Sequence, residues 1–174
     1  LYEGDSNVPE LIDYLNKKNN NIKSLRQLGI LIDNKYYQTN DRIAPSGNSK
    51  PEYGDLKINL YSSLGEIGAY RFWWKQNTIA STILSNRGCR ARCSFCSVRN
   101  FNGKGVRTKS ITSVVDELKY LNEYYGVNHV MWLDDDLLFD KTRTIGMFNE
   151  MVKRKLNMTW DASNGIIASA LSDE

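Results

Sequence analysis

The sequence has 174 residues, of which 41% are hydrophobic and 25% are charged, and its formal net charge is +3. This composition is that of an ordinary globular protein and excludes a disordered chain. No run approaches the roughly eighteen apolar residues of a membrane-spanning helix. The net charge is too small to imply a polyanionic partner by itself. The chain begins Leu1-Tyr2-Glu3, with no initiator methionine and no targeting pattern, so we expect a piece of a longer protein.

The N-terminal region predicts a short helix, a hairpin and a connector. Residues 1–19 hold a helix whose apolar face is formed by Leu11, Ile12 and Leu15. Residues 22–39 predict a hairpin that turns at Asp33-Asn34. Proline and glycine among polar residues indicate that 40–58 is a connector over the surface, and we place a domain boundary there.

An aromatic segment and a strand come next. Residues 59–76 are rich in aromatic side chains, which we expect to pack between domains: Tyr61, Tyr70, Phe72, Trp73 and Trp74. The apolar, β-branched segment from Thr78 to Leu84 then predicts a buried strand. This strand leads directly into the cysteines.

All three cysteines lie within one short stretch, as Cys89, Cys93 and Cys96. Soft thiolates at such spacing are typical ligands of an iron–sulfur cluster or a zinc ion. A structural zinc site normally has four protein ligands, and the only histidine, His129, lies far downstream on an expected strand. Thiols kept reduced for a metal favour a cytoplasmic setting.

The rest of the chain alternates helical and strand patterns. Ser110 and Gly126 supply an N-cap and a C-terminal glycine for the first of these helices. Alternation of this kind predicts an α/β fold with a parallel sheet, whose reactive groups lie where the strands end. The expected elements are a helix over 111–125, a strand over 127–133, a helix over 140–156 and a strand over 158–160.

Polar side chains stand at the same edge as the cysteines. The second strand of this sheet runs into Asp134-Asp135-Asp136, and the third is followed by Asn164. Judged from the residues alone, adjacent carboxylates usually form a solvated loop or cap a helix, and an asparagine in such a place can simply fix a turn.

The C-x3-C-x2-C spacing, with the aromatic Phe95 just before the last cysteine, resembles the signature of the radical S-adenosylmethionine enzymes. The resemblance implies that Cys89, Cys93 and Cys96 bind a [4Fe–4S] cluster. In that family the methionine end of S-adenosylmethionine chelates the fourth iron, and one-electron reduction cleaves the sulfonium.

The resemblance also implies four residues that contact cofactor. The strand end at Asp134 and Asp135 is similar to the cobalamin-type members' motif, at the position where the family contacts the methionine amino group. A carboxylate suits an ammonium group through charge-assisted hydrogen bonds. Asn164 lies in a Trp-x-x-x-Asn-Gly-Ile segment found in some of these members, and Phe95 completes the set.

The order of helix, hairpin and connector in residues 1–58 is similar to the exit from the cobalamin-binding domain of the cobalamin-type members. The resemblance therefore implies three regions: residues 1–58 are the tail of a Rossmann-like cobalamin-binding domain with its connector, 59–76 are an aromatic linker, and 77–174 are the first half of a radical S-adenosylmethionine (β/α) partial TIM barrel.

The implied function is an enzyme that reductively cleaves S-adenosylmethionine, with methyl transfer through methylcobalamin as the expected reaction. Radical cyclisation or rearrangement and tRNA methylthiolation are alternative reactions. A Cys3His zinc module that binds nucleic acid or protein is the alternative of another class. The enzyme interpretation implies a small-molecule or peptide substrate and a flavodoxin- or ferredoxin-type electron donor, and it favours neither nucleic acid nor a membrane as partner.

Overall fold

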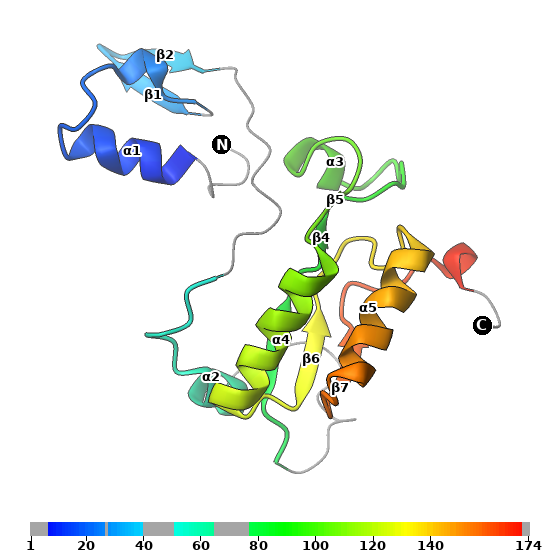
Figure 1. Ribbon diagram of the computed structural model, residues 1–174. Coiled ribbons are helices and arrows are strands. Elements are labelled where there is room, and N and C mark those ends of the chain that lie inside the picture. The colour runs from blue at the N-terminus through cyan, green and yellow to red at the C-terminus, as the bar shows by residue number, and fades with distance from the viewer. Residues whose placement is uncertain (1–6, 27, 40–50, 65–76, 172–174) are drawn as a thin grey trace. The chain divides into compact units, whose positions relative to one another are not determined.

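The computed structural model describes residues 7–26, 28–39, 51–64 and 77–171 (Figure 1). The chain forms two compact units, Leu1–Ser46 and Gly47–Glu174. The division lies within residues 40–58, the segment in which the sequence places a domain boundary. Within the described residues, no helix is long and apolar enough to cross a membrane.

The described residues of the first unit form one helix, a single 3-10 turn and a hairpin. Its elements are α1 (Asn7–Leu15), η1 (Ile22–Ser24), β1 (Gly29–Ile32) and β2 (Lys35–Gln38). The predicted hairpin is confirmed: β1 and β2 are antiparallel, and both residues of the turn, Asp33 and Asn34, have positive φ. This backbone matches the twist of the flanking strands, and asparagine and aspartate adopt it more readily than most residues.

Apolar side chains of this unit remain exposed. Leu15 and Leu31 are 67% and 68% exposed, and Ile12 is 49% exposed. Leu25 is the one apolar side chain that is buried among the residues described here. The described part of the unit therefore leaves much apolar surface in contact with water.

The second unit is built on a parallel sheet of three strands in the order β3-β6-β7. The strands are β3 (Ala80–Ile83), β6 (His129–Trp132) and β7 (Thr159–Ala162). Both parallel pairings confirm the predicted α/β fold with a parallel sheet. Since the strands are parallel, the residues that follow Ile83, Trp132 and Ala162 emerge at one edge.

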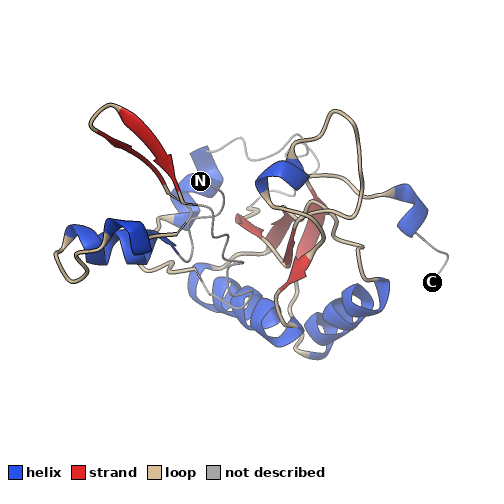
Figure 2. Cartoon of the chain, turned by 90° about the horizontal axis from the view of Figure 1, so that it is seen from above, coloured by secondary structure: helices blue, strands red, loops and turns tan. Residues whose placement is uncertain are grey.

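Two helices cover one face of this sheet, α4 (Ile111–Tyr125) and α5 (Lys141–Lys153) (Figure 1, Figure 2). The core lies between them and the strands, and its most deeply buried apolar side chains are Val114, Val115, Leu118, Leu121, Val130, Trp132 and Met147.

Both helices begin with a side-chain cap. The Ser110 hydroxyl accepts from the Ser113 amide at 3.1 Å, and the Asp140 carboxylate accepts from the Arg143 amide at 3.0 Å. Gly126 ends α4 in the left-handed conformation with φ of 67°. The sequence predicts these parts for Ser110 and Gly126, and the structure confirms both.

Five short elements complete the described part of the unit: α2 (Ile58–Leu64), β4 (Asn86–Arg87), α3 (Val98–Phe101), β5 (Arg107–Thr108) and η3 (Ala168–Ala170). The expected aromatic linker over 59–76 begins inside α2, where the Ser62 hydroxyl accepts from the Ala80 amide at 2.8 Å. Its aromatic residues Tyr70, Phe72, Trp73 and Trp74 lie outside the described residues.

Candidate functional site

The cysteines lie on a loop over residues 88–106, which we call the cysteine loop. It leaves the sheet after β3, and its two ends are joined by the antiparallel pair of β4 and β5. Cys93 and Cys96 are exposed, Cys89 is half-buried, and all three are free thiols. The loop therefore lies at the edge of the sheet where the strands end.

The two arms of the cysteine loop meet closely at Gly88. This residue has φ of 93°, a conformation that residues with a Cβ rarely adopt. A Cβ placed there would lie 2.4 Å from the carbonyl oxygen of Gly105. Both the backbone conformation and the space therefore require glycine directly before the first cysteine.

The chemistry of the donor set fits an iron–sulfur cluster, because three free thiols share one loop. In the described part of the chain, no three Cys, His, Asp or Glu side chains are already gathered closely enough to hold a metal ion. Burial raises the pKa of the Cys89 thiol, and the carboxylates of Asp136 and Asp135 raise it further, whereas a hydrogen bond from Ala91 lowers it. A bound cation would reverse this balance and favour the thiolate.

Phe95 is 91% exposed on this loop. The structure therefore places the aromatic side chain beside Cys96 in solvent. Its predicted contact with a cofactor remains a prediction.

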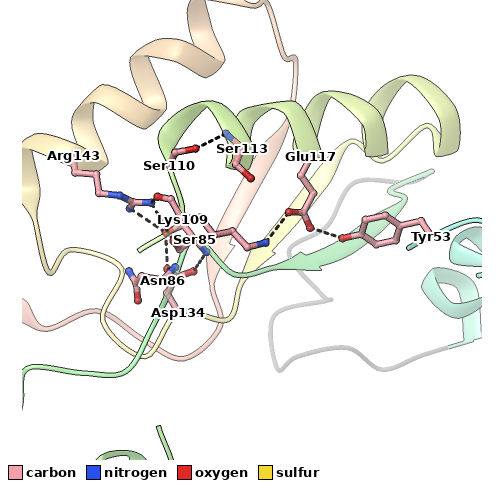
Figure 3. Close-up of polar contacts among 9 residues, drawn as sticks. All are labelled: Tyr53, Ser85, Asn86, Lys109, Ser110, Ser113, Glu117, Asp134 and Arg143. Carbon is pink, nitrogen blue, oxygen red and sulfur yellow. Dashed lines mark hydrogen bonds and ion pairs between the residues drawn. The ribbon is translucent and has the colours of Figure 1, made fainter. Parts of the chain in front are cut away.

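Asp134 is buried at the end of β6, with 1% of its surface exposed. Its carboxylate accepts from the Ser85 hydroxyl at 2.6 Å, the Ser85 amide at 3.0 Å and the Asn86 amide at 2.7 Å (Figure 3). Burial raises the pKa of this carboxyl, and the three hydrogen bonds and the Arg143 charge act in the opposite direction. These oxygens are thus already occupied by the chain that enters the cysteine loop.

Asp135 and Asp136 face the cysteine loop itself. Asp135 is half-buried and accepts from the Asn102 side-chain amide at 2.8 Å. Asp136 is buried and forms an ion pair with Arg90, with 3.1 Å between Nε and Oδ2. Its Oδ1 atom is buried and has no hydrogen-bond partner among the described residues. Of the two carboxylates predicted to bind cofactor, Asp134 and Asp135, Asp135 is the more accessible.

Asn164 connects the ends of two strands. Its side-chain amide donates to the Leu133 carbonyl at 2.7 Å, and Gly165 follows it with φ of 84°. The asparagine lies at the expected edge of the sheet, where it fixes the turn after β7. The structure thus supplies a conformational role, and the cofactor role stays a prediction.

His129 lies at the opposite end of the sheet from the cysteines, since it pairs with Ala80 at the start of β3. Its ring nitrogens face Thr159 at 2.8 Å and Asp161 at 3.0 Å. A buried imidazole held in this way agrees with a structural histidine, so the geometry gives no support to a Cys3His zinc site.

A buried polar chain, which the sequence patterns did not predict, runs from the connector to the base of the cysteine loop (Figure 3). Tyr53 donates to Glu117 at 2.6 Å, and Glu117 forms an ion pair with Lys109 at 2.8 Å. Burial and the Glu117 carboxylate raise the pKa of Tyr53, so its hydroxyl stays a donor. The sequence did carry a signal of this buried charge, because Glu117 falls on the apolar face of α4 between Val114 and Leu121.

Comparison with known proteins points to methyltransferases, although no family model matches the chain. The chain is 27% identical over 109 residues to the cytidylyl-2-hydroxyethylphosphonate methyltransferase of Streptomyces wedmorensis. The matched region covers 63% of the chain and 20% of that protein. It is 31% identical over 83 residues to the bacteriochlorophyllide d C-12(1)-methyltransferase of Chlorobaculum tepidum, which covers 47% of the chain and 18% of that protein.

The fold is similar to that of TsrM from Kitasatospora setae, a radical S-adenosylmethionine methyltransferase, with a TM-score of 0.63 and 18% identity. One structure of TsrM contains tryptophan as substrate and an S-adenosylmethionine analogue, and another contains cobalamin and a [4Fe–4S] cluster. The chain resembles the cobalamin-binding radical S-adenosylmethionine proteins.

The similarity covers part of each relative. It extends over 88% of this chain but 28% of the TsrM chain, and the chain spans about a fifth of the curated relatives it matches. The resemblance expected from the cysteine spacing is thus confirmed for the region that these relatives share with the chain.

Proposed function

We propose that this chain is part of a radical S-adenosylmethionine methyltransferase. The observation that carries the proposal is the cysteine loop: three free thiols at the C-terminal edge of a parallel sheet. Cys89, Cys93 and Cys96 would hold a [4Fe–4S] cluster, one thiolate to each of three irons. When bound, the cluster supplies the electron that cleaves S-adenosylmethionine.

The residues around the loop can orient the cofactors. Asp135 is the carboxylate we assign to the methionine amino group, because the oxygens of Asp134 are already bonded to Ser85 and Asn86. Asn164 holds the turn after β7 beside the same edge. Exposure of Cys93 and Cys96 leaves the loop accessible to a flavodoxin- or ferredoxin-type electron donor.

In this proposal residues 77–174 are the first half of a (β/α) partial TIM barrel. The order β3-β6-β7 and the placement of α4 and α5 on one face agree with it. Residues 1–58 would be the tail and connector of a Rossmann-like cobalamin-binding domain, and cobalamin would carry the methyl group to a small-molecule or peptide substrate. The methyltransferase relatives favour this reaction over radical cyclisation, rearrangement or tRNA methylthiolation.

Anaerobic reconstitution of the complete protein tests the proposal. We expect about four iron and four sulfide per chain, and loss of the cluster when any one of Cys89, Cys93 or Cys96 is changed to Ala. A Ser94→Ala variant in the same loop is the matched control and should keep the iron. Stoichiometric zinc, with no thiolate-to-iron absorbance, would instead support the zinc module.

A further inference from the structure

The cysteine loop has two stems that lie side by side. The ascending stem is Ser85 with β4, and the descending stem is β5 with Lys109. The Lys109 amide donates to the Ser85 carbonyl at 2.9 Å, which extends the pairing of β4 with β5. Any residue that bonds both stems therefore fixes the two ends of the loop that carries the thiols.

Arg143 bonds both stems from the first turn of α5. Its guanidinium donates to the Ser85 carbonyl at 3.1 Å, to the Lys109 carbonyl at 2.8 Å and to the Ser85 hydroxyl at 3.4 Å (Figure 3). Its backbone amide is bonded to the Asp140 cap, which sets the position of the side chain. A planar fork with several donors suits two carbonyl groups at once, whereas a lysine ammonium does not reproduce that geometry.

Asp134 holds the ascending stem from the end of β6. Every hydrogen bond given above for its carboxylate comes from Ser85 or Asn86. Burial lowers the pKa of the Arg143 guanidinium, and the negative charge of Asp134 acts in the opposite direction. The stems are thus held by opposite charges from two different elements.

The descending stem has a second attachment through its side chain. Lys109 forms an ion pair with Glu117 of α4 at 2.8 Å, and Glu117 accepts from Tyr53 at 2.6 Å. Lys109 and Glu117 are both largely buried, with side-chain exposures of 11% and 1%. Three elements, β6, α4 and α5, therefore converge on the base of a loop whose tip is exposed.

We propose that Asp134 and Arg143 form a stem clamp whose role is to position the cysteine loop for its cluster. The inference rests on the proposed function. The loop lies mostly in solvent between its stems, so the spacing of Cys89 from the other thiols depends on how the base is held. Outer groups that orient ligands influence metal affinity in this way. Asp134 and Arg143 act through the loop and are positioning residues.

The test uses Arg143→Lys and Asp134→Asn in the complete protein, with Arg154→Lys as the matched control. Arg154 lies at the other end of α5 and pairs with Glu150 and Asp116, away from both stems. In metal-free, reduced protein, the alkylation rate of each cysteine is followed by mass spectrometry. Circular dichroism reports whether each variant is folded.

We expect both clamp variants to label Cys89 faster than the unmodified protein does, while the labelling of Cys93 and Cys96, which are already exposed, changes little. After reconstitution, iron should be lost to a chelator about ten to a hundred times faster, and the spectrum of the reduced cluster should change. Arg154→Lys should match the unmodified protein in every measurement. A residue that only stabilised the fold would not alter Cys89 selectively.

Wild-type labelling and iron release in both folded clamp variants would overturn the stem clamp. If both variants unfold, hydrogen exchange of the unmodified protein decides: the amides of Ser85, Asn86 and Lys109 must be protected, and exchange as fast as at the loop tip refutes the clamp. Failure of the unmodified protein to assemble any iron cluster would contradict the proposed function. The alkylation rates would still show whether Asp134 and Arg143 position the cysteine loop.

Discussion

At the scale of single residues, three adjacent carboxylates have three different environments. Asp134 is buried and bonded to the start of the cysteine loop, Asp135 is half-buried beside Asn102, and Asp136 is paired with Arg90. The sequence shows only that they are adjacent. Their partners lie 33 to 49 residues away, so local patterns could not assign the roles.

Asp135 is the residue whose change should separate cofactor binding from cluster binding. Asp135→Ala should leave the iron content intact but weaken binding of S-adenosylmethionine by about 1.5–3 kcal/mol, because a hydrogen bond between charged groups is lost. Equilibrium dialysis of the reconstituted protein measures the affinity. Asp116→Ala, an exposed change on α4, is the control. Unchanged affinity for Asp135→Ala would show that this carboxylate does not bind the cofactor.

At the scale of elements, the helix over 111–125 was predicted with the bounds that the structure has, because its caps and apolar face are local features. The strand β7 was also expected, although it begins one residue later than predicted. The two-residue strands β4 and β5 were not foreseen. They exist because Asn86 pairs with Thr108 across the whole cysteine loop, and such pairing leaves no periodic signal in the sequence.

The N-cap of α4 gives a direct test of how this helix is stabilised. Ser110→Ala removes the oxygen that accepts from the Ser113 amide, so the free energy of unfolding should fall by about 1 kcal/mol. Ser113→Ala keeps that amide and replaces serine by a better helix former, so it should be neutral or slightly stabilising. Urea unfolding of the two variants measures the difference. Equal destabilisation by both would show that the cap is not what matters.

At the scale of the whole molecule, the cysteine spacing carried the most information. It led to the family resemblance, and the parallel sheet behind the loop agrees with it. The point at which the connector ends and the core of the second unit begins was harder to predict. Tyr53 and Ile58, expected to belong to a connector, are buried in the core of the second unit, and the partner of Tyr53 on α4, Glu117, is distant in sequence.

Cobalamin binding is a property that we expect of the complete protein and not of these 174 residues. The chain spans about a fifth of its curated relatives, and its first unit exposes apolar side chains such as Leu15 and Leu31. An uncovered apolar face associates nonspecifically, and an open strand edge such as that of β7 pairs with other chains. The isolated chain should therefore be poorly soluble or oligomeric.

Extension by about 130 to 150 residues upstream, a typical domain length, should supply the sheet that α1 covers and create a site for hydroxocobalamin. Equilibrium dialysis should show binding to the extended protein and none to the isolated 174 residues. An upstream region without alternating strands and helices, or an extended protein that leaves hydroxocobalamin free, would remove the cobalamin assignment. Because the cluster depends on the three cysteines and not on this region, iron binding should survive that outcome.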